Sequence, residues 1–348
     1  MLGPATALRE KASLLPVDDG NSIPDASHGD YCEKKKIWIS EQPTMRIWAV
    51  LVAYQRDTEV ERLLNALAKQ STKLSGVIII DNADQASTAC LSERHGAHYI
   101  GSKRNLGGAG GFALGMMTAL AHGAEHIWLW DDDGFPEDER CLGLLLDAAL
   151  EHSADLISPL VVNDANHEET AFAFRLSGKR TNSRQEVQQN ALIKDFVHLF
   201  NGALLRADAL ERFGLPDYRF FIRGDEVDFM YRLVRAGGKV FTYPAAVACH
   251  PSGAGDVHKV PGLPFGVVVP TCPLRREITF RNRAQNFLRH RKFILQIADY
   301  PRYGLYFLVR TKPDFSGFWH WLRATWQGYR GIMGRQQPHE SSKRVFKP

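Results

Sequence analysis

The sequence has few cysteines and no long apolar segment. Five of the 348 residues are cysteines, and they are scattered without a CxxC pair. This spacing excludes a zinc ribbon and a disulfide framework, and it suits a reducing, cytoplasmic compartment. No stretch approaches the roughly 18 uncharged apolar residues that a membrane-spanning helix needs. Residues 1–30 show no apolar segment after the first charged residues, so we expect no signal peptide.

The composition lacks any extreme, but the charge is unevenly distributed. Hydrophobic residues make up 44% and charged residues 24%, which excludes a disordered chain, a collagen and a coiled-coil rod. The formal net charge is +4, yet residues 281–348 carry 14 Lys and Arg against three acids. That tail therefore has a charge of +11, which leaves −7 for the preceding 280 residues. The pattern predicts an acidic body followed by a basic, aromatic extension.

Alternating strands and helices are predicted in the first half of the chain, after a weakly structured leader at 1–44. Nearly continuous apolar runs predict buried strands, and apolar positions at helical spacing predict the helices between them. This alternation indicates βαβ units and a mostly parallel sheet, as in a nucleotide-binding half-domain over 45–163. The expected strands are 46–54, 76–82, 97–102, 126–133 and 155–163, and the expected helices are 58–70, 110–122 and 137–152.

The second half of the chain has a weaker pattern. Residues 164–255 are expected to form the acceptor-binding half, with a loop or hairpin over the sheet at 164–194, a helix at 225–236 and a strand at 239–250. A Gly- and Pro-rich mobile loop is expected at 253–273. Helices are expected at 275–292 and 303–329. We therefore expect a catalytic domain over 45–255 and a loop with a helical extension over 256–348.

Three consecutive acids, Asp131 to Asp133, follow the buried strand HIWLW, and Gly134 and Pro136 break the chain after them. Ligands of open parallel sheets bind at the carboxyl ends of the strands. Three carboxylates there repel one another unless a cation is bound, and oxygen ligands suit Mg²⁺ or Mn²⁺. The alternative is a solvated acidic turn before the helix at Glu137.

Other polar segments fall near the same predicted edge. Asp81 ends the strand GVIIID, where an acid often contacts a ribose or base but is also common as a turn residue. The segment KRNLGGAGGF (103–112) suits an approach to phosphates at a helix N-terminus, although a plain flexible loop competes with this reading. Asp225 and Glu226 begin a helix and could supply a general base, or could merely favour the helix dipole. His250 ends the last strand and could bind a transition metal or be structural.

Together these motifs resemble glycosyltransferase family 2, whose members are inverting enzymes with a GT-A fold. The resemblance covers roughly 46–255 and rests on VLVAYQR, IIIDN, NLGGAGGF, WDDD, FNGALL, RGDEVDF and a final CH, in that order. It is closest to bacterial galactofuranosyltransferases, and rhamnosyltransferases share most of the scheme. The resemblance implies an α/β fold with a GT-A-type, Rossmann-like mixed sheet flanked by helices, followed by the mostly helical basic extension.

The resemblance also implies a role for each matching residue. Asp131, Asp133 and His250 would hold Mn²⁺ or Mg²⁺, and Glu226 would be the base, with Asp225 beside it. The donor nucleotide would contact Tyr54, Arg56, Asp81, Arg104, Asn105, Gly107, Gly108 and Asp132. The acceptor would contact Trp130, Asn201, Gly202 and Asp225.

The function expected from these roles is transfer of a sugar from a nucleotide donor to a glycan or lipid-linked glycan, at the inner face of the cytoplasmic membrane. UDP-galactofuranose is the expected donor, and dTDP-rhamnose is the alternative. A nucleotidyltransferase is a more distant alternative, because the first strand runs into AYQRDTE without the usual glycines. The acidic body argues against nucleic-acid binding by the tail. The Trp, Phe, Lys and Arg residues of the basic extension predict peripheral membrane contact. Packing on the catalytic domain or a homo-oligomer interface is the alternative.

Overall fold

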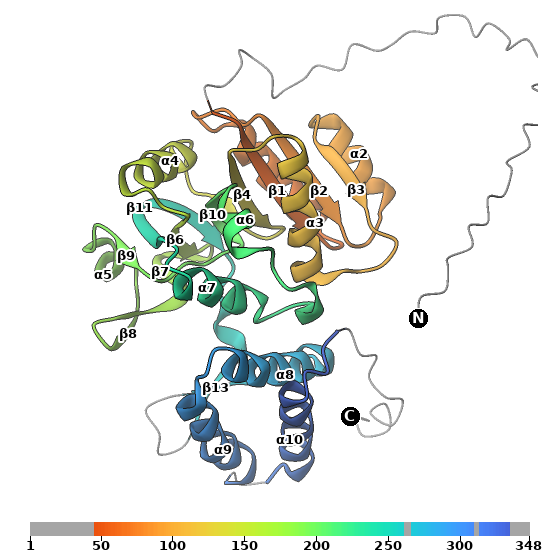
Figure 1. Cartoon of the computed structure of the whole chain (residues 1–348), viewed down its shortest axis with the longest axis vertical. Helices are drawn as coiled ribbons and strands as arrows, with labels where there is room; N and C mark the ends of the chain where they lie inside the picture. The colour runs from red at the N-terminus through yellow and green to blue at the C-terminus, as the bar shows by residue number, and fades with distance from the viewer. Residues whose placement is uncertain (1–44, 261–265, 310–312, 335–348) are drawn as a thin grey trace, which may run out of the picture. The chain divides into compact units, whose positions relative to one another are not determined.

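The computed structural model describes residues 45–260, 266–309 and 313–334, all of which belong to one unit of the chain, Lys36–Pro348 (Figure 1). The predicted leader at 1–44 and part of the predicted loop at 253–273 lie outside the described residues. The following elements are therefore those of the described part.

A mixed sheet forms the centre of the fold (Figure 1). Strand β10 runs antiparallel to both of its neighbours, β4 on one side and β6 on the other. Strands β3, β2, β1 and β4 run parallel to one another, as do β6 and β11. The central members of this set, β1, β2, β4 and β6, are apolar runs buried on both faces. The strand order is β3 (His98–Gly101), β2 (Gly76–Asp81), β1 (Ile47–Ala53), β4 (His126–Asp131), β10 (Asn201–Arg206), β6 (Leu156–Asn163), β11 (Val240–His250) and β5 (Phe135–Pro136).

Helices cover both faces of this sheet, which gives the predicted α/β layers. Along β1 successive side chains point to opposite faces, so Leu51 packs with one set of helices and Val50 with the other. The first set is α1 (Asp57–Ala68), α2 (Ala86–Arg94) and α4 (Cys141–His152). The second set is α3 (Gly107–Ala121), α6 (Ala209–Phe213) and α7 (Asp225–Arg235).

Two predicted helix boundaries were wrong. Helix α3 begins at Gly107 and not at Gly110, so the glycine run lies within the helix. A Cβ at Gly111 would come within 2.7 Å of Val52, and the run therefore lets α3 pack closely on β1. Helix α4 begins at Cys141 and not at Glu137, because the chain first forms β5.

The hairpin expected within 164–194 is present, formed by β7 (Asn166–Leu176) and β8 (Lys179–Ser183). It leaves the sheet from β6, and α5 (Arg184–Gln188) and β9 (Ile193–Lys194) follow it. The hairpin thus adds side chains near the end of β11, where His250 lies.

The C-terminal extension has its own apolar core, built by a small sheet and three helices. These elements are β12 (Val257–Lys259), β13 (Gly266–Val268), α8 (Pro273–Arg289), α9 (Phe293–Leu308) and α10 (Phe315–Tyr329). The single helix expected at 303–329 was wrong, because α9 ends at Leu308 and α10 begins at Phe315. Among the described helices, none is long and apolar enough to span a bilayer. The proposed boundary near residue 255 stays a prediction.

Candidate active site

The predicted acids gather where the parallel strands end. In the sheet register Ala53 lies opposite Asp81, and Val52 lies opposite Asp131. Asn201, the first residue of antiparallel β10, pairs with Trp130 at this same edge. Segments far apart in the sequence therefore deliver their polar residues to one place, as the strand pattern predicted.

The short strand β5 explains how Asp133 reaches His250. After Asp131 the chain turns at Gly134, and Phe135 then pairs with Cys249, the neighbour of His250. The Nε2 atom of His250 consequently lies 2.9 Å from Oδ1 of Asp133. This contact joins two of the three predicted metal ligands.

Arg56 and the backbone of Tyr54 bind the other side of the acid triplet. Arg56 donates a hydrogen bond to Asp132 at 3.1 Å and another to Asp133. The N–H of Tyr54 donates to Asp132 at 2.9 Å, and its ring is 44% exposed. Asp132 is thus held beside the predicted donor residues, whereas Asp133 faces His250.

The electrostatic environment shifts the pKa values of Asp131 and Asp133 in opposite directions. Burial raises the pKa of Asp131, and the charges of Asp132 and Asp133 raise it further. Burial also pushes the pKa of Asp133 upward, but His250 and Arg56 outweigh it, and the pKa falls to about 2. Burial lowers the pKa of His250, yet Asp133 more than compensates, so this pKa is raised. A carboxylate with a raised pKa among other acids is a group that a cation would stabilise.

The side chains fit a divalent cation. Oδ1 of Asp133 is buried beside Nε2 of His250, and Asp131 stands next to two further acids that raise its pKa. Carboxylates crowded in this way are stabilised by a bound cation. Two carboxylates and an imidazole are a donor set for Mn²⁺, and the carboxylates also suit Mg²⁺.

Asp225 and Glu226 have different environments at the start of α7. Asp225 is buried, and a Cβ at Gly108 would lie 4.0 Å from its Oδ2. Burial, then the neighbouring Glu226 and more weakly Asp131, raises the pKa of Asp225 well above its usual range. Glu226 is only half-buried, and its Oε2 accepts a hydrogen bond from the N–H of Gly224 at 2.8 Å. The more accessible acid is therefore Glu226.

Asp81, which was expected to contact the nucleotide, makes its hydrogen bonds within the protein. Asp81 is fully buried and accepts hydrogen bonds from the N–H groups of Ala83 and Gln85 and from the Tyr99 hydroxyl. This is the turn role that was the alternative for Asp81, and its contact with a nucleobase stays a prediction.

In the segment 103–112, one of the predicted donor residues also makes a hydrogen bond within the protein. Asn105 accepts a hydrogen bond from the N–H of Gly107 at 2.8 Å, while Arg104 is exposed.

Trp130 is buried in this structure, and its contact with an acceptor stays a prediction. Its ring is fully buried and packs edge-on against Trp128, because β4 directs it into the core shared with α1 and α4. A Cβ at Gly202 would approach the Trp130 ring to 2.7 Å, so glycine permits this packing. Asn201 lies at the edge, with a buried Oδ1 that has no hydrogen-bond partner. The buried Nε1 of Trp130 also lacks a hydrogen-bond partner, but of these two predicted acceptor residues Asn201 is the one that is not fully buried.

Sequence reasoning missed two residues next to His250. The Phe172 ring lies 5.0 Å from His250 and 4.9 Å from His198. Burial, and to a lesser extent the charge of His250, lowers the pKa of His198 to about 3, so His198 is neutral. No local motif marks either residue, because the β7–β8 hairpin brings Phe172 to this place from a distant part of the chain.

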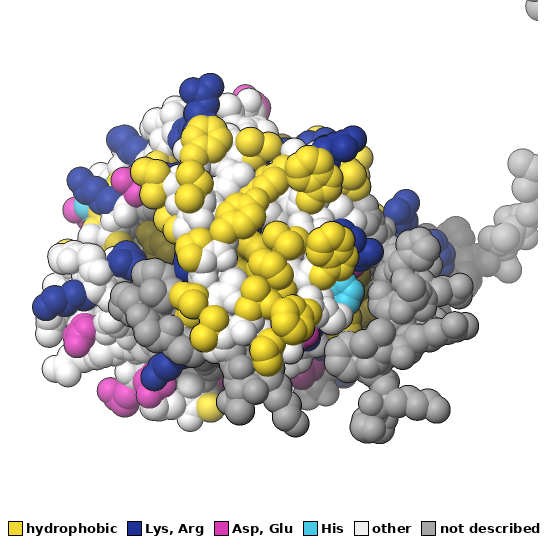
Figure 2. Space-filling view, turned by 90° about the horizontal axis from the view of Figure 1, so that it is seen from below, with side chains coloured by type: hydrophobic (Ala, Val, Ile, Leu, Met, Phe, Trp, Pro, Cys, Tyr) yellow, Lys and Arg dark blue, Asp and Glu magenta, His cyan; other side chains and the backbone are white. Residues whose placement is uncertain are grey.

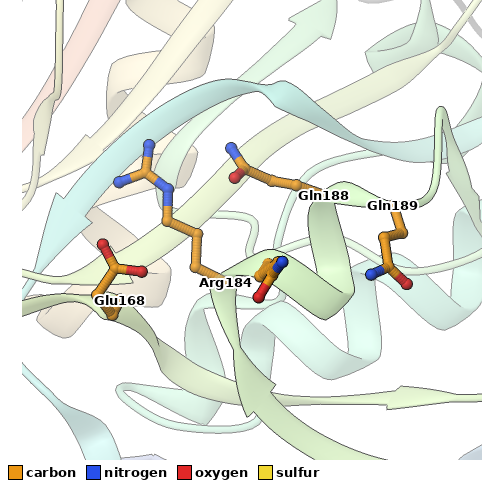
Figure 3. A pocket seen from close by; sticks show the side chains of 5 residues that line it. Glu168, Arg184, Gln188 and Gln189 are labelled. Carbon is orange, nitrogen blue, oxygen red and sulfur yellow. The ribbon is translucent and has the colours of Figure 1, made fainter.

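Two other polar clusters lie outside the acid site. A pocket of about 440 Å³ is lined by polar side chains of β7 and α5 and by none of the predicted site residues (Figure 3). Glu137, His167 and Cys249 come together close enough to bind a metal. However, Arg184 already makes two 2.8 Å hydrogen bonds to Glu137, so this cluster is an ion pair in the structure. Neither cluster is assigned to the reaction.

The fold of this chain is similar to that of a solved glycosyltransferase structure. A crystal structure of GalNAc-T7 with UDP, GalNAc and Mn²⁺ matches with a TM-score of 0.51 and 14% identity, over 70% of this chain and 47% of that one. The chain thus spans about half the length of that protein. At this identity the match establishes the glycosyltransferase fold alone.

The sequence of this chain is similar to a family model and to two known glycosyltransferases. Residues 48–214 match the family model for glycosyl transferase family 2. Galactofuranosyltransferase GlfT1 of Mycobacterium tuberculosis (strain H37Rv) is 37% identical over 305 residues, which cover 84% of this chain and 98% of that protein. The dTDP-rhamnosyl transferase RfbF of Shigella flexneri is 24% identical over 300 residues, covering 83% and 97%. The chain therefore belongs to glycosyl transferase family 2 and is a glycosyltransferase.

Proposed function

We propose that this enzyme transfers galactofuranose from UDP-galactofuranose to a hydroxyl group of a lipid-linked or polysaccharide acceptor, with inversion. The observation that carries the proposal is the 37% identity to a galactofuranosyltransferase over nearly its whole length. The convergence of Asp133 and His250, which the sequence resemblance anticipated, supports it.

The side chains suit single displacement. Glu226 takes the proton from the acceptor hydroxyl as that oxygen bonds to the anomeric carbon. The bond from the anomeric carbon to the diphosphate breaks, and UDP leaves with the electron pair. Asp131, Asp133 and His250 would hold Mn²⁺ or Mg²⁺, which neutralises charge on the departing diphosphate when bound. Arg56 orients Asp132 and Asp133 around that position.

The donor can be tested without knowing the acceptor. With Mn²⁺ present, UDP-galactofuranose should raise the melting temperature of the full chain more than dTDP-rhamnose does, because a ligand stabilises the native state by mass action. A larger rise with dTDP-rhamnose would favour the rhamnosyltransferase alternative. In an assay with a glycan acceptor, free UDP should appear, whereas release of pyrophosphate would indicate nucleotidyl transfer.

We also propose that the extension contacts the surface of an anionic membrane. Apolar side chains gather on the face of α9 and α10 seen in Figure 2, with Lys and Arg at its rim. We call these residues the apolar face. Its most exposed members are Phe293, Ile294, Ile297, Phe315, Trp319 and Trp326. Aromatic and aliphatic side chains bordered by basic residues favour the interface of a bilayer that contains anionic lipids.

We expect Ile294→Ser combined with Trp319→Ser to reduce binding to anionic liposomes at low salt at least about fivefold, because two exposed apolar side chains that would enter the bilayer interface are lost. Co-sedimentation measures the binding, and Leu150→Ser, at an exposed position of α4, is the matched control. Deleting α9 and α10 is a poorer test, since Tyr303 and Trp321 form the core with Phe280. Unchanged binding by the double variant would refute membrane contact through the apolar face, and a shift from dimer to monomer would assign the face to self-association.

A further inference from the structure

The five residues before the catalytic acids have an unusual backbone. Phe221 has φ of +68° and ψ of −69°, and the N–H of Ile222 donates to the carbonyl of Phe220 at 2.9 Å. This is the strained form of the γ-turn, which is rare. Arg223 at φ +59° and Gly224 at φ +94° follow, so three of the residues 220–224 have left-handed values. We call residues 220–224 the acid-bearing loop.

Two asparagines of α8 hold this loop by its carbonyl groups. Nδ2 of Asn282 lies 2.9 Å from the oxygen of Phe220, 2.9 Å from that of Ile222 and 2.7 Å from that of Arg223. Nδ2 of Asn286, one helical turn further, donates to the oxygen of Gly224 at 2.8 Å. Two side-chain amides thus contact four of the five carbonyls, and the two N–H groups of Asn282 are shared among three of them.

The orientation of Asn282 is fixed from the other side. Its Oδ1 accepts a hydrogen bond from Nε of Arg281 at 3.0 Å, so the amide nitrogen must face the loop. Arg281 and Asn282 are each 1% exposed and Asn286 is 4% exposed, and water therefore cannot replace these contacts. The fit is close, because a Cβ at Gly224 would lie 3.1 Å from Nδ2 of Asn286.

The loop also connects the two sides of the predicted active site. The carbonyl of Phe221 accepts a hydrogen bond from the N–H of Ala109 in α3 at 3.1 Å. The N–H of Gly224 donates to Glu226 at 2.8 Å. A change in the dihedral angles of the loop would therefore move both acids relative to the donor side of the site.

We propose that Asn282 and Asn286 are positioning residues for the reaction: they impose the strained conformation of the acid-bearing loop and so place Glu226 and Asp225 for catalysis. This inference rests on the proposed function of those two acids. It makes α8, in the C-terminal extension, part of the machinery that sets the turnover number.

The other role open to these asparagines is to attach α8 to the catalytic domain. Separate contacts already do this, because Arg289 donates to Asp228 at 2.9 Å and to Asp217 at 2.9 Å, and His290 lies 3.0 Å from Asp228. The Arg289 cluster joins α8 to α7 and to Asp217 and binds none of the carbonyls of the acid-bearing loop, although the guanidinium of Arg289 lies 5.4 Å from the centre of the Phe220 ring. It therefore provides the comparison that separates attachment from positioning.

The test uses the full chain with Asn282→Ala, Asn286→Ala, Arg289→Gln and the exposed Thr279→Ala on the same helix. Steady-state release of the nucleoside diphosphate gives kcat and KM, and thermal unfolding gives the melting temperature with and without UDP. We expect both asparagine variants to lose at least about tenfold in kcat, which is the effect of a displaced general base. Their stabilisation by UDP should stay close to that of wild type. Arg289→Gln should lower the melting temperature and keep kcat, and Thr279→Ala should change neither.

The inference is overturned if the asparagine variants keep wild-type kcat, or if Arg289→Gln loses kcat as strongly at the same loss of melting temperature. Should Asn282→Ala fail to fold, Asn286→Ala decides, since it removes a single 2.8 Å hydrogen bond. The comparison is run with whichever sugar nucleotide wild type uses. Failure of the galactofuranose donor in wild type is thus distinct from failure of the positioning role.

Discussion

Asp133→Asn is expected to reduce sugar transfer at least about a thousandfold, because it removes a ligand and a charge from the proposed cation site. The initial rate of UDP release with Mn²⁺ measures this loss, and EDTA should produce it reversibly in wild type. A second readout is independent of activity: Mn²⁺ should raise the melting temperature of wild type but not of the variant. Asp138→Asn, an exposed acid in the same segment, is the control. Full activity of wild type in EDTA would disprove the metal role.

The pKa values predict opposite effects on the stability of the metal-free protein. The folded-state pKa of Asp133 is lowered to about 2, so its charge stabilises the fold above the unfolded pKa of about 3.9. Asp133→Asn should therefore lower the melting temperature at pH 7, and the difference should disappear as the pH falls from about 4 to about 2. The pKa of Asp131 is raised, chiefly by burial, so its charge opposes folding at neutral pH. Asp131→Asn should accordingly raise the melting temperature while abolishing transfer.

Glu226→Gln should lower kcat by about a hundredfold to ten-thousandfold, the usual contribution of a general base. The amide keeps the shape of the side chain but cannot accept the proton of the acceptor hydroxyl. Binding of UDP, measured by thermal shift, should be unchanged, because the proposed role of Glu226 is to take the proton of the acceptor hydroxyl and not to bind the nucleotide.

Asp225→Asn provides the comparison for that base. Because Asp225 is buried and its pKa is already raised, a neutral amide is close to its resting state. We expect a smaller loss of kcat and a higher KM for the acceptor. If Asp225→Asn were inactive while Glu226→Gln turned over normally, the roles of the two acids would be exchanged.

The fold could be predicted where the pattern of apolar residues in the sequence matches the pattern of burial in the structure. The strands around Leu51, Ile79 and Leu129 are apolar runs buried on both faces, and the polar residues that end them reach a common edge for that reason. The glycines at 107–111 could not be interpreted from the local sequence. Their closeness to β1 depends on the tertiary structure, and the same residues would suit a phosphate loop equally well.

The conformation and the environment of the site could not be predicted in the same way. Nothing in the letters RFFIRG indicates that Phe221 and Arg223 take left-handed values, since only Gly and Asn adopt them without strain. Asn282 and Asn286 read as ordinary polar positions of a helix, and their partners are about 60 residues earlier in the chain. Trp130 shows a related limit: the buried strand HIWLW was predicted, but the local sequence does not reveal that the Trp130 ring packs on Trp128, and its contact with an acceptor stays a prediction.

The contacts of Asn282 and Asn286 with the acid-bearing loop have a consequence for protein engineering. The segment that matches the family model ends at residue 214, before both proposed catalytic acids and before α8. A chimera that exchanged only residues 48–214 with a relative would pair one protein's α3 with another protein's loop, across the contact between Ala109 and Phe221. The exchangeable cassette for altering donor choice should therefore run without interruption from β1 through α8, so that both supports of the loop are inherited from one parent.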